Sequence, residues 1–237
     1  MKIQIPEEYR QQVQDYSEYD YAPERTVNVT SFVNKVYALM CAALLVTAGV
    51  SWWTVNNLTT DVIITWMWPA MIAEFVMVLA LNCLAHRLPM AISALAMLGY
   101  AALNGFTLSI FFLFYTKESL AGAFAVSAGI FGVMSLYGTV TRRDLTSVGS
   151  LCFMALLGLI LAGIVNIFLH SETLEFIASC FGVLVFTGLV AYDSQQIRRF
   201  GEAGNGNGSL AVLASLGLYL DFVNLFLYLV RLMGKRK

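Results

Sequence analysis

The sequence predicts an all-α integral membrane protein that folds as a seven-helix bundle. Its 237 residues are 59% hydrophobic and only 12% charged, whereas soluble domains are typically about 25% charged. The apolar runs exceed ~18 residues, which is the length that crosses a bilayer as a helix rather than as a barrel strand. Only four prolines occur, so few helix breakers interrupt these runs.

Hydropathy and turn signals divide most of the chain into seven segments with short connections. The connections carry helix breakers or charges, and the longest, Gly201–Ser209, is rich in glycine and asparagine. The predicted helices cover residues 32–55, 62–85, 89–115, 119–140, 147–169, 174–197 and 210–233.

Residues 1–30 are polar and lack the apolar core of a signal peptide. We therefore expect a mobile cytoplasmic tail over residues 1–30 and a single seven-helix transmembrane domain over residues 31–237. Because the tail is acidic and rich in tyrosine, a protein-interaction motif is the alternative interpretation. No basic patch with interleaved aromatic residues occurs, so we expect no nucleic-acid partner.

Basic residues predict that the N-terminus is cytoplasmic, because cytoplasmic loops carry an excess of Lys and Arg. With that orientation the outer loops hold only Lys117. The inner side holds Lys2, Arg10, Arg25, Lys35, Arg87, Arg142, Arg143, Arg198 and Arg199. The basic C-terminal residues break this pattern if the last segment crosses fully, so that segment either crosses despite its charges or re-enters the membrane.

Two aspartates are the strongest indication of function. Asp193 and Asp221 each lie inside an apolar segment, where a carboxylate costs roughly 2.5–3.5 kcal/mol on insertion scales. At 1.5 Å per residue, Asp193 lies ~10 Å and Asp221 ~15 Å from the inner ends of their segments. The two depths differ by less than one helical turn, and we expect the two carboxyl groups to pair.

The surrounding residues extend this polar site. In the last segment Gly217, Asp221, Asn224, Tyr228 and Arg231 fall on one helix face. Gln196 lies one turn from Asp193, and Glu74 is the remaining acid deep in a predicted helix. A helix with a single polar face belongs in the interior of a bundle or along a pore.

Two carboxylates that share a dry site cannot both be charged at low cost, so the pair binds a proton or a metal cation and titrates as a unit. Ca²⁺ is the metal that we expect at Asp193 and Asp221, because it prefers oxygen ligands at ~2.3–2.6 Å. A structural, protonated carboxyl is the alternative for each acid. We expect no tightly bound cofactor.

An enzyme is not expected. The motifs of serine hydrolases, zinc proteases, P-loop proteins and dinucleotide-binding proteins are absent from the sequence. Two intramembrane aspartates are also typical of membrane aspartyl proteases. Neither Asp193 nor Asp221 has the Gly-x-Gly-Asp context of those enzymes.

The C-terminal part of the chain contains two distinctive stretches, Ala191–Ile197 (AYDSQQI) and Leu218–Gly234 (LYLDFVNLFLYLVRLMG). The Leu-Tyr-Leu-Asp-Phe-x-Asn-Leu-Phe run of the second stretch is the most specific. The two stretches resemble the two C-terminal signatures of the Bax inhibitor-1 family. Two further stretches resemble the bacterial, YccA-like branch of that family, namely Met134–Leu145 (MSLYGTVTRRDL) and Phe153–Asn166 (FMALLGLILAGIVN). The resemblance runs from about Phe32 to Gly234.

This resemblance implies a bundle in which six helices surround a central C-terminal helix, and a pH-sensitive calcium leak channel in the inner membrane of a bacterium. Asp193 and Asp221 match the aspartates that form the proton- and calcium-responsive gate of the family. Glu74 matches an acid of the second helix. Some members carry an arginine that latches the gate, but here that position is Ala85. His86 or Arg87 would have to replace the arginine, or closure works differently.

The resemblance also implies an alternative function, because bacterial relatives associate with a membrane protease. The protein would then be a non-transporting partner that modulates the protease or a stress response, and the tail would be its contact. Proton-coupled solute transport is a third hypothesis, but Asn104, Asn166 and Asn224 are its few candidate binding groups.

Overall fold

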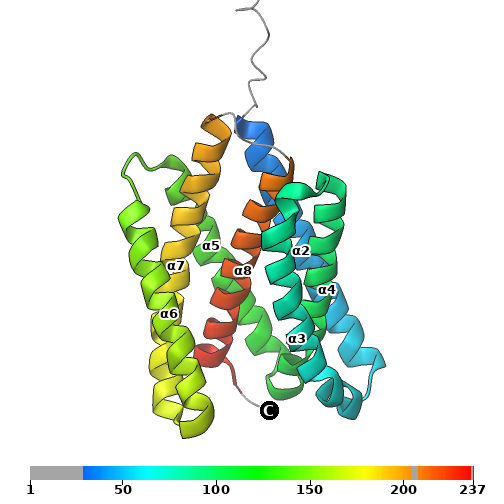
Figure 1. Ribbon diagram of the computed structural model, residues 1–237. Coiled ribbons are helices and arrows are strands. Elements are labelled where there is room, and N and C mark those ends of the chain that lie inside the picture. The colour runs from blue at the N-terminus through cyan, green and yellow to red at the C-terminus, as the bar shows by residue number, and fades with distance from the viewer. Residues whose placement is uncertain (1–28, 204–207, 236) are drawn as a thin grey trace, which may run out of the picture.

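Seven long helices run up and down through the described part of the chain in the computed structural model (Figure 1). The structure describes residues 29–203, 208–235 and 237. Within these residues no strand occurs, and all seven helices are long and apolar enough to cross a membrane. The predicted fold class is confirmed. The helices are α2 (Val29–Asn57), α3 (Thr60–Leu84), α4 (Met90–Phe114), α5 (Lys117–Val140), α6 (Thr146–Leu169), α7 (Glu172–Glu202) and α8 (Gly208–Met233).

We call the end of the bundle where α2 begins the proximal end, and the end where α8 finishes the distal end. The proximal end also carries residues 85–89 and 141–145, and the distal end carries the α4–α5 and α6–α7 connections (Figure 1). The predicted tail falls on residues 1–28, outside the described part of the chain, so its mobility and its role stay predictions.

Two of the helices begin with a side-chain N-cap. The Thr116 hydroxyl accepts a hydrogen bond from the Ser119 backbone N–H (3.3 Å) at the start of α5, and the Ser171 hydroxyl accepts one from the Leu174 N–H (3.3 Å) at the start of α7. Such N-caps satisfy donors that the helix leaves unpaired. Because short turns separate most of the helices, each helix reverses direction relative to its predecessor.

The sixth predicted segment is longer than its apolar run. Instead of ending at Ile197, α7 continues to Glu202. Its last turn is polar, and Arg198 forms an ion pair with Glu202 one turn later (3.2 Å between Nε and Oε1). Hydropathy marks only the part of a helix that lies in hydrocarbon, so it does not register this polar extension.

The C-terminal helix α8 has the most buried span among the described helices. It packs against α2, α4, α5 and α7, and 56% of its most apolar stretch is buried. Helix α3 packs mainly on α4, and helix α6 packs mainly on α7. Figure 1 places α8 between α7 and α2. The expected enclosure of a central α8 by all six other helices is not confirmed.

The shape of α8 bears on whether the last segment crosses the membrane fully or re-enters it. It is one continuous helix of 26 residues, which corresponds to ~39 Å at 1.5 Å per residue. Its C-terminal end lies at the distal end of the bundle, opposite the start of α2 (Figure 1). The last segment therefore has the length and course of a full crossing, despite the basic residues that follow it.

Candidate functional site between α7 and α8

Helices α7 and α8 bring the two predicted aspartates together. The carboxyl groups of Asp193 and Asp221 lie within hydrogen-bonding reach of each other. The Asp221 side chain is buried, with 7% of its surface exposed, and Asp193 is half-buried. The spatial pairing that the sequence predicted is present, whereas the role of the pair as a gate stays a prediction.

Close helix contacts fix the position of Asp193. A Cβ atom at Gly138 of α5 would lie 2.1 Å from the backbone oxygen of Ala191. A Cβ atom at Gly149 of α6 would lie 2.5 Å from the Tyr192 ring. Small residues allow such close approach of helices in a membrane. Both neighbours of α7 therefore hold the turn that carries Asp193.

Helix α8 also makes room for the pair. A Cβ atom at Gly217, one turn before Asp221, would lie 3.1 Å from Oδ2 of Asp193. The Asp193 carboxyl therefore rests against the bare backbone of α8. A larger residue at Gly217 would push this carboxyl away from its present position.

The aspartate pair has no basic partner among the described residues, and one of its oxygen atoms receives no hydrogen bond. Among the described residues, neither Asp193 nor Asp221 forms a salt bridge. The Oδ2 atom of Asp221 is buried and receives no hydrogen bond from a conventional donor. A buried carboxylate oxygen without a partner is costly. A proton between the two carboxyl groups, or a cation bound by both, satisfies this oxygen.

The donor atoms suit a hard cation in type but not in number. Ca²⁺ takes about 6–8 oxygen ligands, and two carboxylates supply four oxygens at most. Within the described residues, no group of three or more His, Cys, Asp or Glu side chains comes together. Calcium at this pair would therefore keep part of its water shell, as a transient ion does.

A cluster of hydroxyl groups adjoins the pair toward the proximal end. Ser194 follows Asp193, and its hydroxyl donates to the Ser135 hydroxyl of α5 (3.1 Å). The Tyr37 hydroxyl of α2 donates to Ser194 (3.1 Å) and also contacts Ser135. Sequence reasoning missed this cluster, because single hydroxyl groups are common in apolar helices and their spacing shows no pattern.

A cavity of about 520 Å³ opens at the distal end between α6, α7 and α8. Its polar lining residues are Asn166, Glu175, Tyr228 and Arg231. The Tyr228 ring packs directly on the backbone of Gly182 in α7. A Cβ atom at Gly182 would lie 2.6 Å from this ring. Tyr228 and Arg231 belong to the predicted polar face of α8, which also carries Asp221.

The predicted supporting amides do not hydrogen-bond to the aspartates. The Asn224 side chain donates to the Leu220 backbone oxygen in its own helix (2.8 Å). Gln196 donates to the Tyr192 hydroxyl (2.7 Å). Its neighbour Gln195, which the prediction omitted, is buried and joins α7 to the α5–α6 connection. Gln195 accepts from the Leu145 N–H (2.9 Å) and donates to the Arg143 oxygen (2.7 Å).

Glu74 belongs to a separate polar cluster on α3 and α4. It accepts a hydrogen bond from the Thr107 hydroxyl (2.6 Å) and contacts the Asn104 side chain. This cluster extends toward α8 through the aromatic rings of Tyr100 and Tyr219, whose centroids are 6.0 Å apart. Glu74 therefore does not join the aspartate pair.

The role of His86 or Arg87 as a basic latch stays a prediction. Ala85 is buried, and Arg87 lies exposed in the short helix η1 (Ala85–Arg87). The side chain of His86 lies outside the described part of the structure. Arg198 donates to the Thr139 oxygen (2.6 Å).

Asp144 in the proximal α5–α6 connection is an acid outside the helices. It accepts hydrogen bonds from Thr146, and it pairs with Arg199 at 2.9 Å. These contacts lower the pKa of Asp144 to about 2, and the hydrogen bond from the Thr146 hydroxyl has the largest effect. Because folding lowers the pKa of Asp144, these contacts stabilise the folded state at neutral pH. That stabilisation is lost only as the pH falls through about 2. Asp144 therefore stays ionised across the physiological range.

Comparison with known proteins agrees with this architecture. Residues 29–237 match the family described as Inhibitor of apoptosis-promoting Bax1. The chain is 39% identical over 216 residues to the inner membrane protein YbhL of Escherichia coli, and this match covers 87% of the chain and 92% of YbhL. An uncharacterised protein of Borreliella burgdorferi is 41% identical over 214 residues, with 87% and 92% coverage. The protein YrjE of Lactococcus lactis is 36% identical over 224 residues, with 89% and 93% coverage. The chain is therefore an integral membrane protein of the Bax inhibitor-1 family.

Proposed function

We propose that this protein is a pH-sensitive calcium leak channel that is gated by Asp193 and Asp221. The observation that carries the proposal is the paired, buried carboxyl groups, with one Asp221 oxygen that receives no conventional hydrogen bond. Intramembrane acids of this kind mark ion or proton pathways.

Polar groups on both sides of the pair support a pathway. On the distal side, the cavity with Glu175 and Arg231 gives access to water, and Tyr228 and Asn224 lie on the same helix face as Asp221. Tyr228 stands seven residues from Asp221, which corresponds to ~10 Å along α8. On the proximal side, the hydroxyl cluster around Ser194 supplies oxygen atoms for a cation.

The proposed gate works through charge. When the pair shares a proton, the two carboxyl groups hydrogen-bond and hold α7 against α8. Loss of that proton leaves two carboxylates in contact, which repel each other unless a cation binds between them. Calcium and the proton therefore compete for one site, because a metal ligand must be deprotonated. The gate opens as the pH rises.

Calcium flux tests this proposal. The purified full chain, in liposomes that contain a calcium indicator, is expected to pass more calcium as the assay pH rises from about 5 to about 8, because loss of the shared proton opens the gate. We expect a change of about ten-fold, within the usual range for coupled sites. Flux that equals that of protein-free liposomes at every pH would contradict the proposal.

The proposed location is the inner membrane of a bacterium, with the proximal end in the cytoplasm. The relative YbhL is named an inner membrane protein. The excess of basic residues at the proximal end, including Arg142 and Arg143, supports this orientation. The alternative function as a partner of a membrane protease depends on residues 1–28, which lie outside the described structure.

A further inference from the structure

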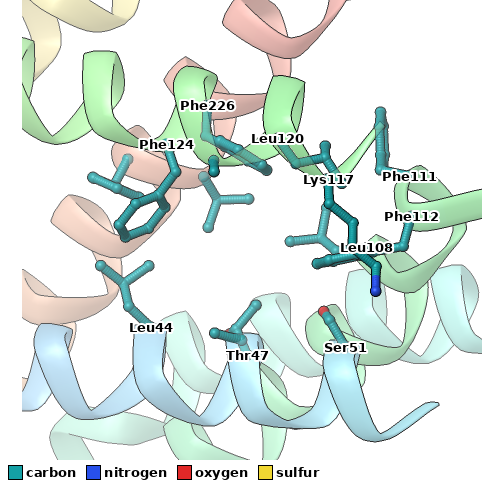
Figure 2. Close-up of a pocket in the computed structure, with 14 residues that line it drawn as sticks. Leu44, Thr47, Ser51, Leu108, Phe111, Phe112, Lys117, Leu120, Phe124 and Phe226 are labelled. Atoms are coloured by element: carbon teal, nitrogen blue, oxygen red, sulfur yellow. The ribbon is translucent and has the colours of Figure 1, made fainter. Parts of the chain in front are cut away.

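A second cavity, of about 330 Å³, lies between α2 and α5 with α4 and α8 behind it (Figure 2). Its volume falls at the lower end of the range for small-molecule sites. Nearly all of its lining is apolar, and much of it is aromatic. The apolar lining residues are Leu44, Ala48, Leu108, Phe111, Phe112, Leu120, Ala121, Phe124, Phe222, Val223 and Phe226.

Three polar side chains line this cavity, and two of them already have partners. The Thr47 hydroxyl bonds to the Tyr219 hydroxyl (2.8 Å) and to two backbone oxygens. The Ser51 hydroxyl donates to the Gly105 oxygen (2.6 Å). Among the described residues, Lys117 forms no ion pair and no hydrogen bond through its ammonium group. An occupant would therefore meet an apolar wall and one available cation.

The available cation lies at the distal end of the cavity. Lys117 is the first residue of α5, and in Figure 2 its ammonium group lies at the same end as Ser51. From Lys117 the lining continues inward to Phe124, seven residues later, which corresponds to ~10 Å along the helix. The cavity is therefore elongated along the membrane normal, with its charge at the membrane surface.

Two further lysines lie near this end. The Lys235 backbone N–H donates to the Ser119 hydroxyl (3.0 Å), so the residues after α8 pack on the start of α5. The Lys237 ammonium donates to the Phe112 oxygen (2.7 Å). Glu118 is the acid of this turn, and it is exposed without forming an ion pair to Lys117. The local charge favours an anion.

We propose that this cavity binds an acyl chain of an anionic phospholipid, whose headgroup phosphate is held by Lys117. An acyl chain matches the narrow apolar lining, and basic pockets between transmembrane helices bind anionic headgroups. The lipid comes from the leaflet at the distal end. Its chain packs against Phe222 and Phe226 of α8 on one side and against Leu44 of α2 on the other.

Native mass spectrometry of the full chain tests this site with phosphatidylglycerol and phosphatidylcholine of identical acyl chains. The wild-type protein is expected to retain phosphatidylglycerol preferentially. Lys117→Gln is expected to lower that preference about five-fold, which corresponds to the ~1 kcal/mol of one Lys beside an anionic headgroup. Arg142→Gln, which removes an exposed cation at the proximal end, is the matched control and should leave the preference unchanged.

Variants that fill the cavity distinguish lipid binding inside it from general electrostatic attraction of lipids to the protein surface. Ala121→Phe places a ring in the cavity and is expected to reduce the binding of both lipids, whereas Val126→Phe, at an exposed position of α5 outside the cavity, should not. Ala48→Phe fills the cavity from α2 if Ala121→Phe does not fold. Equal binding of the two lipids by the wild-type protein, or cavity variants that behave like Val126→Phe, would overturn the proposal.

Discussion

Replacing Asp221 by asparagine is expected to abolish the pH dependence of calcium flux. An asparagine side chain cannot ionise, so Asp193 then loses the like-charged neighbour whose repulsion opens the gate. Asp221 is the more buried member of the pair and carries the oxygen that receives no conventional hydrogen bond. Flux should change about ten-fold with pH in the wild-type protein, and it should be nearly constant in Asp221→Asn liposomes.

Asp193→Asn is expected to have the same effect, because the pair titrates as a unit. Asp144→Asn is the matched control, since Asp144 is an exposed aspartate at the proximal end whose pKa of about 2 keeps it ionised over the range of the assay. Its flux and pH response should equal those of the wild-type protein. An unchanged pH response in both Asp193→Asn and Asp221→Asn would contradict the proposal that these two aspartates form the gate.

The largest effect on stability is expected at Gly138. A Cβ atom at this position would lie 2.1 Å from the oxygen and 2.9 Å from the carbonyl carbon of Ala191. Backbone cannot move aside as a flexible side chain does, so α5 and α7 must separate. Overpacking of this kind costs about 1–3 kcal/mol. Gly138→Ala should lower the free energy of unfolding by about that amount in lipid–detergent micelles.

Gly129→Ala on the same helix is the control for Gly138→Ala. A Cβ atom there has no neighbour within 4 Å, so alanine adds only its better helix propensity, up to about 1 kcal/mol. Gly129→Ala should therefore be neutral or stabilising. If the two alanine variants unfold at the same denaturant concentration, the close contact between α5 and α7 does not contribute to stability as described.

The sequence was informative about the helices because the bilayer restricts what can cross it. Apolar length alone located all seven helices to within a few residues at most ends. The exception was the C-terminal end of α7, where the polar turn after Ile197 continues the helix outside the apolar run. Packing is less accessible to sequence. Close contacts such as Gly138 on Ala191 depend on which glycine faces a neighbour, and glycine spacing alone does not determine that.

For the candidate site, too, the sequence predicted some residues and not others. Asp193 and Asp221 could be found because carboxylates are rare inside helices, and their depths predicted the contact. Amides and hydroxyl groups carry no such signal. One-turn spacing favoured Gln196, but the buried amide between α7 and the α5–α6 connection is Gln195. Tyr37 and Ser135 come from helices far apart in sequence, so only the fold brings them to Ser194.

Infrared difference spectra of the full chain in lipid vesicles, recorded between about pH 8 and pH 5, measure directly whether these two side chains hold one proton. We predict the carbonyl stretch of a single protonated aspartic acid at low pH. The band should disappear in Asp221→Asn, shift in Asp193→Asn and decrease when calcium is added. A band that persists unchanged in both variants would contradict a proton shared between Asp193 and Asp221.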